Sequence, residues 1–466
     1  MPLLTRRAAL AALAATAALL AGCASPPSAT NLPPIVFVHG NGDTAALWTT
    51  TLWRFESNGW PRGRLHAVEF PYPTARDENG VAQAGRSSTD EQRDYLATEV
   101  AKVMASTGSP QVVLMGNSRG GNAIRHYIAT GGGDKTVSHA ILGGTPNHGV
   151  WTNPGFRPNN EFNGTGPFLA GLNAPKGPNG EILPAGSGGN EVTPGPRWMT
   201  IRSDNNDKFA QPDGVWIGAK GTPTGVTFEG PALKGAENVV LPGRDHREVA
   251  YHGQAFAAAF RFITGRAPTV TEPVAEDRVS LNGTVTGFTA AGPTNLPLVG
   301  AKVSVHAIDA KSGQRRGAPL VDKIVGADGQ WGPITTDPRT PLEFVIEAPG
   351  FATTHIYRSA FPRSSNIVNL RPERFADGDK DAAAVASFVR PRAYFGLPRD
   401  SIVFDGQNPA PGIAPGVAGV ANSKLKLSTA NRAVVAEFSS GELRERIVGW
   451  AWPARDNHLS VLELHY

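Results

Sequence analysis

The stretch that decides the fold is VVLMGNSRGGNAIRHY, residues 112–127, an apolar run that breaks at Gly116 and continues as a helix pattern. Its centre, GNSRG at residues 116–120, has the spacing G-x-S-x-G. A serine in a sharp turn between a strand and a helix is exposed at the carboxyl edge of a sheet. The alternative is a serine that only caps the helix. The strand–turn–helix context favours Ser118 as a nucleophile.

Apolar strand patterns alternate with helix patterns between residues 35 and 265. The apolar runs at 35–38 and 111–116 are expected to be buried strands, and residues 137–144 are also predicted to be a strand. The helix predicted at 87–108 begins with Ser, Thr and Asp. This alternation predicts an α/β domain with a mostly parallel sheet and helices on both faces. At 151–196 the pattern gives way to Gly, Pro and Asn, which indicates an insertion over the site.

Acyl transfer also needs hydrogen-bond donors for a developing oxyanion. HGNGD at residues 39–43 follows the first strand, and its two glycines allow close approach of the backbone to a substrate. We expect the amides of Asn41 and Arg119 to form the oxyanion hole. His39 is expected to fix the loop. We also expect the charge of Arg119 to favour substrates with a polar or anionic portion.

The general base must be a histidine that reaches Ser118 from a later loop. His246, between a strand and the closing helix, lies at the same edge of the sheet as the serine and is our candidate. His252 falls inside the helix pattern and is expected to be a packing or surface residue. His148 follows another strand and is a candidate for the substrate pocket.

The orienting acid is expected in SDNNDKFAQPDG, the loop that follows the strand at 197–203. Asp207 fits best, Asp204 is the second candidate, and Asp213 is expected to be a surface charge. The predicted chain order is then Ser118, Asp207, His246, which is the order found in α/β-hydrolases. In this mechanism the histidine deprotonates the serine and water hydrolyses the acyl-enzyme.

The amino terminus has the layout of a secretory signal, with two arginines, an apolar stretch and small residues before Cys23. LAGC at residues 20–23 resembles the bacterial lipobox, which implies lipid attachment at Cys23 after removal of residues 1–22. An ordinary signal peptide with an incidental cysteine is the alternative. Residues 24–34 are predicted to be a tether. The expected location is the bacterial cell envelope, by a lipid anchor, or the secreted fraction.

Composition excludes several functions. Cys23 is the single cysteine, so the chain has no intramolecular disulfide and no thiolate metal site. No H-E-x-x-H occurs, and we expect neither a metal nor a cofactor. The formal charge of +4 is small for 466 residues, and no basic stripe with interleaved aromatic residues occurs, so a nucleic-acid partner is not expected.

The sequence pattern changes beyond residue 265. Residues 266–277 are Pro-rich and predicted to be a linker. Short alternating strands between turn residues predict a β-sandwich at 278–374 and a second β-rich domain at 375–466.

Four motifs, IVFVHGNGD, VVLMGNSRGG, AILGGTPNHG and VVLPGRDHREV, together resemble those of bacterial α/β-hydrolase lipases and esterases. The resemblance covers residues 33–264 and implies the α/β-hydrolase fold and an ester substrate. The region that follows is similar to the β domains appended to some prokaryotic lipases. GTVTGF and LEFVIEAPGF also resemble the transthyretin-like, carboxypeptidase-regulatory type of sandwich.

The main hypothesis is therefore a carboxylic-ester hydrolase of the lipase or carboxylesterase kind. Two alternatives are an esterase or depolymerase acting on an insoluble polyester, and an envelope adhesion lipoprotein with a vestigial hydrolase fold. If the β region serves adsorption to insoluble esters, a chain ending near Gly265 keeps its activity on soluble esters and loses activity on insoluble ones; equal loss of both would count against this role. The alternative is that the β region only stabilises the catalytic core or sets its spacing from the membrane.

Overall fold

The computed structural model describes residues 32–466. The predicted signal segment with its candidate lipidation site Cys23, and the predicted tether up to residue 31, lie outside the described residues. Within 32–466, no helix combines the length and the apolar character needed to span a membrane.

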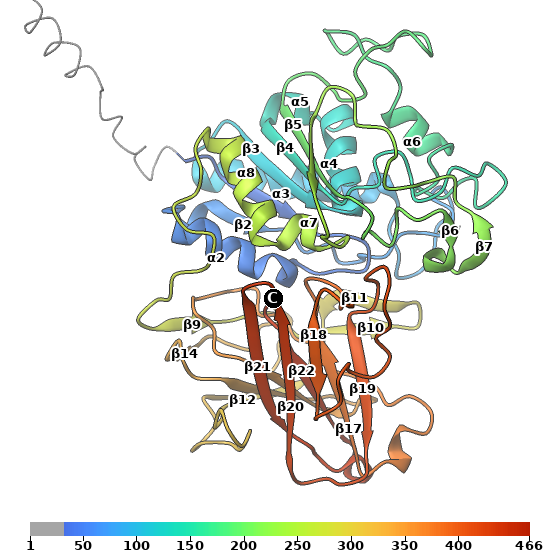
Figure 1. The fold of residues 1–466 in the computed structure, drawn as a ribbon. Coiled ribbons are helices and arrows are strands. Elements are labelled where there is room, and N and C mark those ends of the chain that lie inside the picture. Colours follow the sequence, from blue (N-terminus) through green and yellow to red (C-terminus); the bar gives the residue numbers. More distant parts are fainter. Residues whose placement is uncertain (1–31) are drawn as a thin grey trace, which may run out of the picture. The chain divides into compact units, whose positions relative to one another are not determined.

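The first part of the described chain is built on a six-stranded parallel sheet (Figure 1). In spatial order its strands are β2 (Leu65–Ala67), β1 (Ile35–Val38), β3 (Val112–Asn117), β4 (Val137–Gly143), β5 (Arg197–Ser203) and β8 (Glu237–Leu241). The helices between and after them are α2 (Thr49–Ser57), α3 (Thr89–Thr107), α4 (Arg119–Thr130), α5 (Gly133–Thr136), α6 (Pro167–Leu172), α7 (Glu248–Tyr251) and α8 (Gly253–Thr264). A small hairpin, β6 (Asp213–Gly214) with β7 (Ala219–Pro223), lies in a later loop.

Helices cover both faces of this sheet. Successive side chains of a strand point to opposite faces, and in β1 the side chains on both faces are apolar. Val36 and Val38 of β1 pack with apolar side chains of α3 and α4. Phe37, between them, lies 5.9 Å from the ring of Phe55 in α2, which lies 5.0 Å from Phe256 in α8. The predicted fold class, an α/β-hydrolase followed by an all-β region, is confirmed.

The C-terminal β region has a seven-stranded mixed sheet at its centre. In spatial order its strands are β13 (Val321–Ile324), β12 (Lys302–Ala307), β15 (Leu342–Glu347), β16 (Thr353–Arg358), β22 (His458–Glu463), β17 (Ala384–Val389) and β19 (Asn422–Leu427). The final strand, β22, inserts between β16 and β17 and pairs with both in parallel. Strands from both sides of the predicted boundary at 374–375 therefore pair within one sheet.

Smaller sheets complete this region. They are β9 (Val279–Leu281) with β14 (Ile334–Thr336), β10 (Thr286–Thr289) with β11 (Gly292–Pro297), and β18 (Ser401–Phe404) with β20 (Ala433–Ser440) and β21 (Leu443–Trp450).

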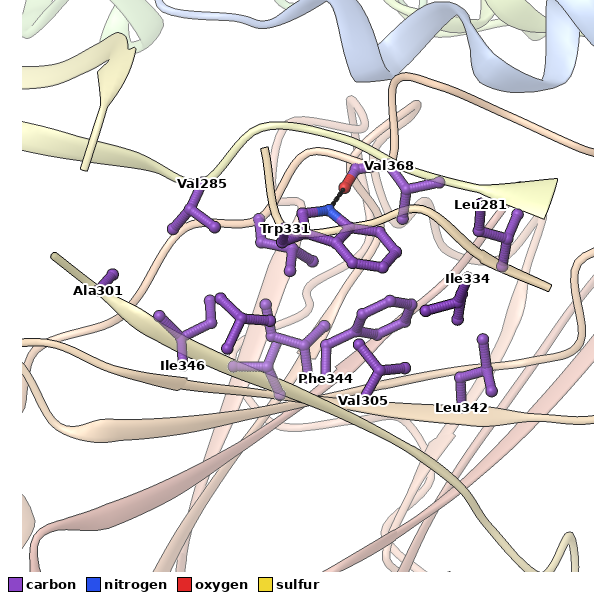
Figure 2. Close-up of a cluster of buried hydrophobic side chains, with 14 of the residues drawn as sticks. Leu281, Val285, Ala301, Val305, Trp331, Ile334, Leu342, Phe344, Ile346 and Val368 are labelled. Atoms are coloured by element: carbon purple, nitrogen blue, oxygen red, sulfur yellow. Dashed lines mark hydrogen bonds between the residues drawn. The ribbon is translucent and has the colours of Figure 1, made fainter. Parts of the chain in front are cut away.

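A buried cluster around Trp331 holds the region together (Figure 2). The indole of Trp331 donates a hydrogen bond to the carbonyl oxygen of Val368 at 2.8 Å and meets the ring of Phe344 edge-on at 5.3 Å. Val385 and Leu459, from the last part of the chain, belong to the same cluster. A second buried cluster is formed mainly by residues 384–464. We refer to residues 279–466 together as the β region.

Candidate active site

Ser118 joins β3 to α4 in a strained conformation. Its φ of 53° and ψ of −123° lie outside the regions that a non-glycine residue ordinarily adopts. Such strain persists only where the surroundings hold it, and it concentrates at functional sites. Ser118 occupies the N-cap position of α4 but makes no capping hydrogen bond with its side chain. The helix-capping alternative is therefore contradicted.

Two glycines allow this turn to pack closely. A Cβ atom at Gly120 would lie 2.4 Å from the carbonyl oxygen of Val38, and one at Gly116 would lie 2.7 Å from a methyl carbon of Ile124. Larger residues at these positions would separate α4 from the sheet. The G-x-S-x-G spacing is thus a packing requirement as well as a sequence motif.

His246 and Asp207 form a pair beside the serine. His246 lies in the loop between β8 and α7, and its Nδ1 is 2.8 Å from Oδ2 of Asp207. The other carboxylate oxygen accepts a hydrogen bond from the backbone amide of Phe209 at 2.8 Å, and the Phe209 ring meets the imidazole edge-on at 4.7 Å. Ser118 and His246 line the same pocket, with a volume of about 390 Å³. With Nδ1 occupied, Nε2 is the nitrogen left for proton transfer.

The two alternative carboxylates have other partners. Asp204 accepts hydrogen bonds from the backbone amides of Asn205 at 2.6 Å and Gly243 at 3.0 Å, so it fixes the neighbouring loops. Asp213 is exposed and accepts from the backbone amide of Val215. Of the three predicted candidates, the structure brings only Asp207 to the imidazole of His246.

The remaining candidate histidines also lie apart from the serine. His252 caps α8 by accepting a hydrogen bond from the amide of Gln254, and burial lowers its pKa to about 3. His148 pairs with Glu191 at 3.1 Å and lines a second pocket of about 240 Å³, which Asp207 and His246 also line. Within residues 32–466, no three His, Cys, Asp or Glu side chains are grouped as metal ligands.

The predicted oxyanion hole has backbone amides without an acceptor among the described residues. Asn41 lines the pocket, and its side-chain oxygen accepts from the amide of Ala75 at 2.8 Å, which fixes the turn. The next two amides, of Gly42 and Asp43, donate to backbone carbonyls. In the part of the chain that the structure describes, the amides of Asn41 and Arg119 have no protein acceptor. Both amides therefore remain available to a substrate oxygen.

The guanidinium of Arg119 does not face the substrate, so the expectation that its charge favours anionic substrates is wrong. The residue is 1% exposed. Its Nε and Nη2 lie 2.7 and 2.6 Å from the two carboxylate oxygens of Glu161, and Nη2 also donates to the carbonyl of Ser87. Arg119 instead ties the 151–196 insertion to the loop that precedes α3.

The C-terminal β region reaches the pocket through Tyr394, which lines it together with Ser118 and His246. The segment that carries this tyrosine, residues 390–400, is bonded to the loop of His246. The carboxylate of Asp245 accepts from the amide of Tyr394 at 2.8 Å, and the guanidinium of Arg247 donates to the carbonyl of Pro391 at 2.6 Å. Asp245 thus points away from the imidazole, toward the β region.

A buried ionic network strengthens this junction. Glu248, at the start of α7, is bonded by Arg390 at 2.9 Å and by Arg399 at 2.5 Å. Arg399 also bonds Asp400. Because the network anchors the segment next to His246, it favours the view that the β region stabilises the catalytic core. A chain ending near Gly265 would lose this anchor.

Several residues at the site were not expected from the sequence. Tyr394, Lys208 and Glu161 contact the pocket or its supports, but none lies in a motif. Lys208 follows Asp207 directly, and its position beside the acid was the one local signal that could have drawn attention to it.

Two family models match separate parts of the chain. Residues 32–160 match the family model described as Lipase (class 2), and residues 277–375 match the model described as Lipase C-terminal domain. A non-heme haloperoxidase of Rhodococcus erythropolis is 28% identical over 114 residues, which are 24% of this chain and 37% of that protein. The chain thus spans little more than a third of the length of that curated relative.

Solved structures of lipases are also similar. The mature form of lipase BlEst2 from Bacillus licheniformis has 18% identity over 52% of this chain and 95% of its own, with a TM-score of 0.35. Its propeptide form has 14% identity over 91% of this chain and 94% of its own, with a TM-score of 0.36.

Proposed function

We propose that this chain, parts of which match the models of a class 2 lipase and of a lipase C-terminal domain, hydrolyses carboxylic esters through Ser118, His246 and Asp207. One observation carries the proposal. A strained serine, with its side chain free of capping, lines the same pocket as a histidine whose other nitrogen is held by a carboxylate at 2.8 Å. A histidine held by a carboxylate, in the pocket that the serine lines, supports the roles of base and orienting acid for these two residues.

In the proposed mechanism, Nε2 of His246 takes the proton of Ser118 as its oxygen attacks the ester carbonyl. Asp207 holds the imidazole in the required tautomer and stabilises the imidazolium. The amides of Asn41 and Arg119 stabilise the oxyanion of the tetrahedral intermediate. The imidazolium then protonates the departing alcohol. His246 then takes a proton from water as the water oxygen attacks the acyl-enzyme. The histidine returns this proton to the serine oxygen when the carboxylic acid leaves.

A soluble, neutral, short-chain ester tests this proposal. We expect the wild-type protein to hydrolyse it and Ser118→Ala to reduce kcat by about 10⁴-fold or more, since the residues of a triad act as a unit. Ser109→Ala is the matched control, because this serine lies in a partly exposed loop after α3 and its hydroxyl donates to the carbonyl of Gln111. Equal turnover by wild type and Ser118→Ala would exclude the serine mechanism.

We further propose that the mature protein is held at the bacterial cell envelope by a lipid on Cys23. The lipobox-like LAGC at residues 20–23 supports this location. Growth of an expressing bacterium with radiolabelled palmitate should label the wild-type protein and leave Cys23→Ser unlabelled. Equal labelling of both, or of neither, would contradict the anchor.

A further inference from the structure

Some of the charged side chains that line the Ser118 pocket form ion pairs and others do not. Seven charged side chains besides His246 line it: Asp43, Asp77, Arg76, Arg86, Arg157, Lys208 and Arg247. Three of the arginines are paired with carboxylates: Arg247 with Asp43, Arg86 with Asp77 and Arg76 with Glu91. The other two cations, Lys208 and Arg157, form no ion pair with a carboxylate anywhere in residues 32–466. The pocket therefore carries two cationic side chains that are not directly paired with a carboxylate within the described residues.

Lys208 is held among aromatic rings. Its ammonium nitrogen lies 4.0 Å from the ring centre of Tyr394, 5.0 Å from that of Phe209 and 5.5 Å from that of Trp216. One hydrogen bond, to the carbonyl of Gly419 at 3.1 Å, uses one of its three N–H donors. The rings attract the cation and restrict its position, but they cannot accept the remaining donors as a carboxylate does. The ammonium is thus fixed at the pocket with donors available to a ligand.

The electrostatic environment of Lys208 agrees with this geometry. Burial, followed by repulsion from Arg247, lowers the pKa of its ammonium to about 8. The other charged groups that face it are the carboxylates of Asp207, Asp245 and Asp43, whose attraction raises the pKa but does not outweigh burial. Each of these carboxylates is bonded to another group. Burial raises the pKa of Tyr394, so its hydroxyl stays neutral where the lysine titrates. An anion placed in the pocket would stabilise the charged lysine.

We propose that the pocket selects esters that carry a carboxylate near the scissile bond, and that Lys208 recognises this carboxylate, assisted by the exposed Arg157. The inference rests on the proposed ester hydrolysis and names its substrate class. Hemiesters of dicarboxylic acids have this chemistry, as do short oligoesters of hydroxy acids with a free acid end. The aromatic side chains of the same wall contact the apolar part of such a substrate.

Two esters with the same scissile methyl group provide the test: monomethyl succinate, which is an anion at neutral pH, and dimethyl succinate, which is neutral. The measured quantity is the ratio of kcat/KM for the anion to that for the neutral diester, from methanol release at low ionic strength. We expect Lys208→Met to lower this ratio about tenfold, which corresponds to about 1.4 kcal/mol. Lys208→Arg, which keeps the charge, should restore most of the ratio, and Arg157→Gln should lower it less than Lys208→Met does.

Lys220→Met is the matched control, since this lysine is exposed on β7 and lines neither the Ser118 pocket nor the neighbouring His148 pocket. Its ratio should equal that of the wild type. Turnover of the neutral diester by each variant reports whether the fold and the Ser118 chemistry are intact. If Lys208→Met does not fold, Lys208→Gln removes the charge with a polar side chain. In the wild type, added NaCl should lower the ratio by screening the contact.

The outcomes separate the two proposals. An unchanged ratio in the charge-removing variants, with the neutral diester still hydrolysed, overturns the role of Lys208 and leaves the ester hydrolase intact. Equal losses on both esters mean that Lys208 is only structural and also overturn it. Failure of the wild type on both esters overturns ester hydrolysis itself and this inference with it.

Discussion

Replacement of Arg390 by methionine tests how the β region supports the catalytic loop. Arg390 is 1% exposed, and its guanidinium bonds Glu248 at 2.9 Å and the carbonyl of Tyr394 at 2.6 Å. It also lies over the ring of Phe438, 4.3 Å from its centre. Methionine keeps an apolar stem against that ring but removes the charge and every donor. Arg390→Met therefore removes the ion pairs and hydrogen bonds of Arg390 at the junction while keeping much of its apolar packing.

Removing one partner of a buried ion pair lowers the free energy of unfolding by about 3–5 kcal/mol, because the other charge stays buried without compensation. Glu248 keeps Arg399 as a partner at 2.5 Å. We therefore expect a loss of about 3 kcal/mol in the free energy of unfolding, at the lower end of that range. Glu248 begins the helix that follows His246, so the loop should also move. A displacement of about 1 Å at a catalytic group can reduce the rate by about 100-fold.

Urea unfolding followed by tryptophan fluorescence measures the first effect, and kcat on a neutral soluble ester measures the second. Arg446→Met is the control, because Arg446 pairs with Glu437 at the surface of the same β region, both half exposed. Such surface pairs contribute about 0–1 kcal/mol. The reasoning is refuted if Arg390→Met matches the control in both unfolding free energy and kcat.

Three further predictions concern the site. Asp207→Asn should lower kcat about 10⁴-fold by favouring the wrong imidazole tautomer, whereas Asp204→Asn should change it far less; steady-state kinetics on one neutral ester compares them. Glu161→Gln leaves Arg119 buried beside a neutral amide and should reduce the free energy of unfolding by about 3 kcal/mol in urea. The preference for monomethyl over dimethyl succinate should be present below about pH 8 and decline above it, as Lys208, whose pKa burial lowers to about 8, loses its proton. Taking the ratio of the two esters at each pH cancels the protonation of the shared base, and a ratio that stays constant through pH 8 would contradict the prediction.

Local sequence patterns were sufficient for the sheet and for the position of the serine. GNSRG at 116–120 could be recognised because its requirements are local: a strand before it, a helix after it, and glycines where a Cβ would meet backbone. The loops that carry His246 and Asp207 could be placed because the carboxyl ends of parallel strands share one edge of the sheet.

The partners of those residues depended on contacts between distant segments. The sequence shows Arg119 as a charge in the turn, and only the folded insertion brings Glu161 to it. In the same way, no local pattern could place Tyr394 beside His246, since the contact requires the β region to pack on the catalytic loop. Nor could a local pattern show that strands from both sides of the boundary predicted at 374–375 pair in one sheet, since β22 comes from the end of the chain.

The central claim is that Ser118 is a nucleophile activated by His246. A fluorophosphonate that reacts with activated serines, followed by peptide mass spectrometry, tests it most directly. The account predicts one phosphonyl group per protein, located on Ser118, and a strongly reduced rate of labelling in His246→Ala. Modification of another residue, or equal labelling of the two proteins, would contradict it.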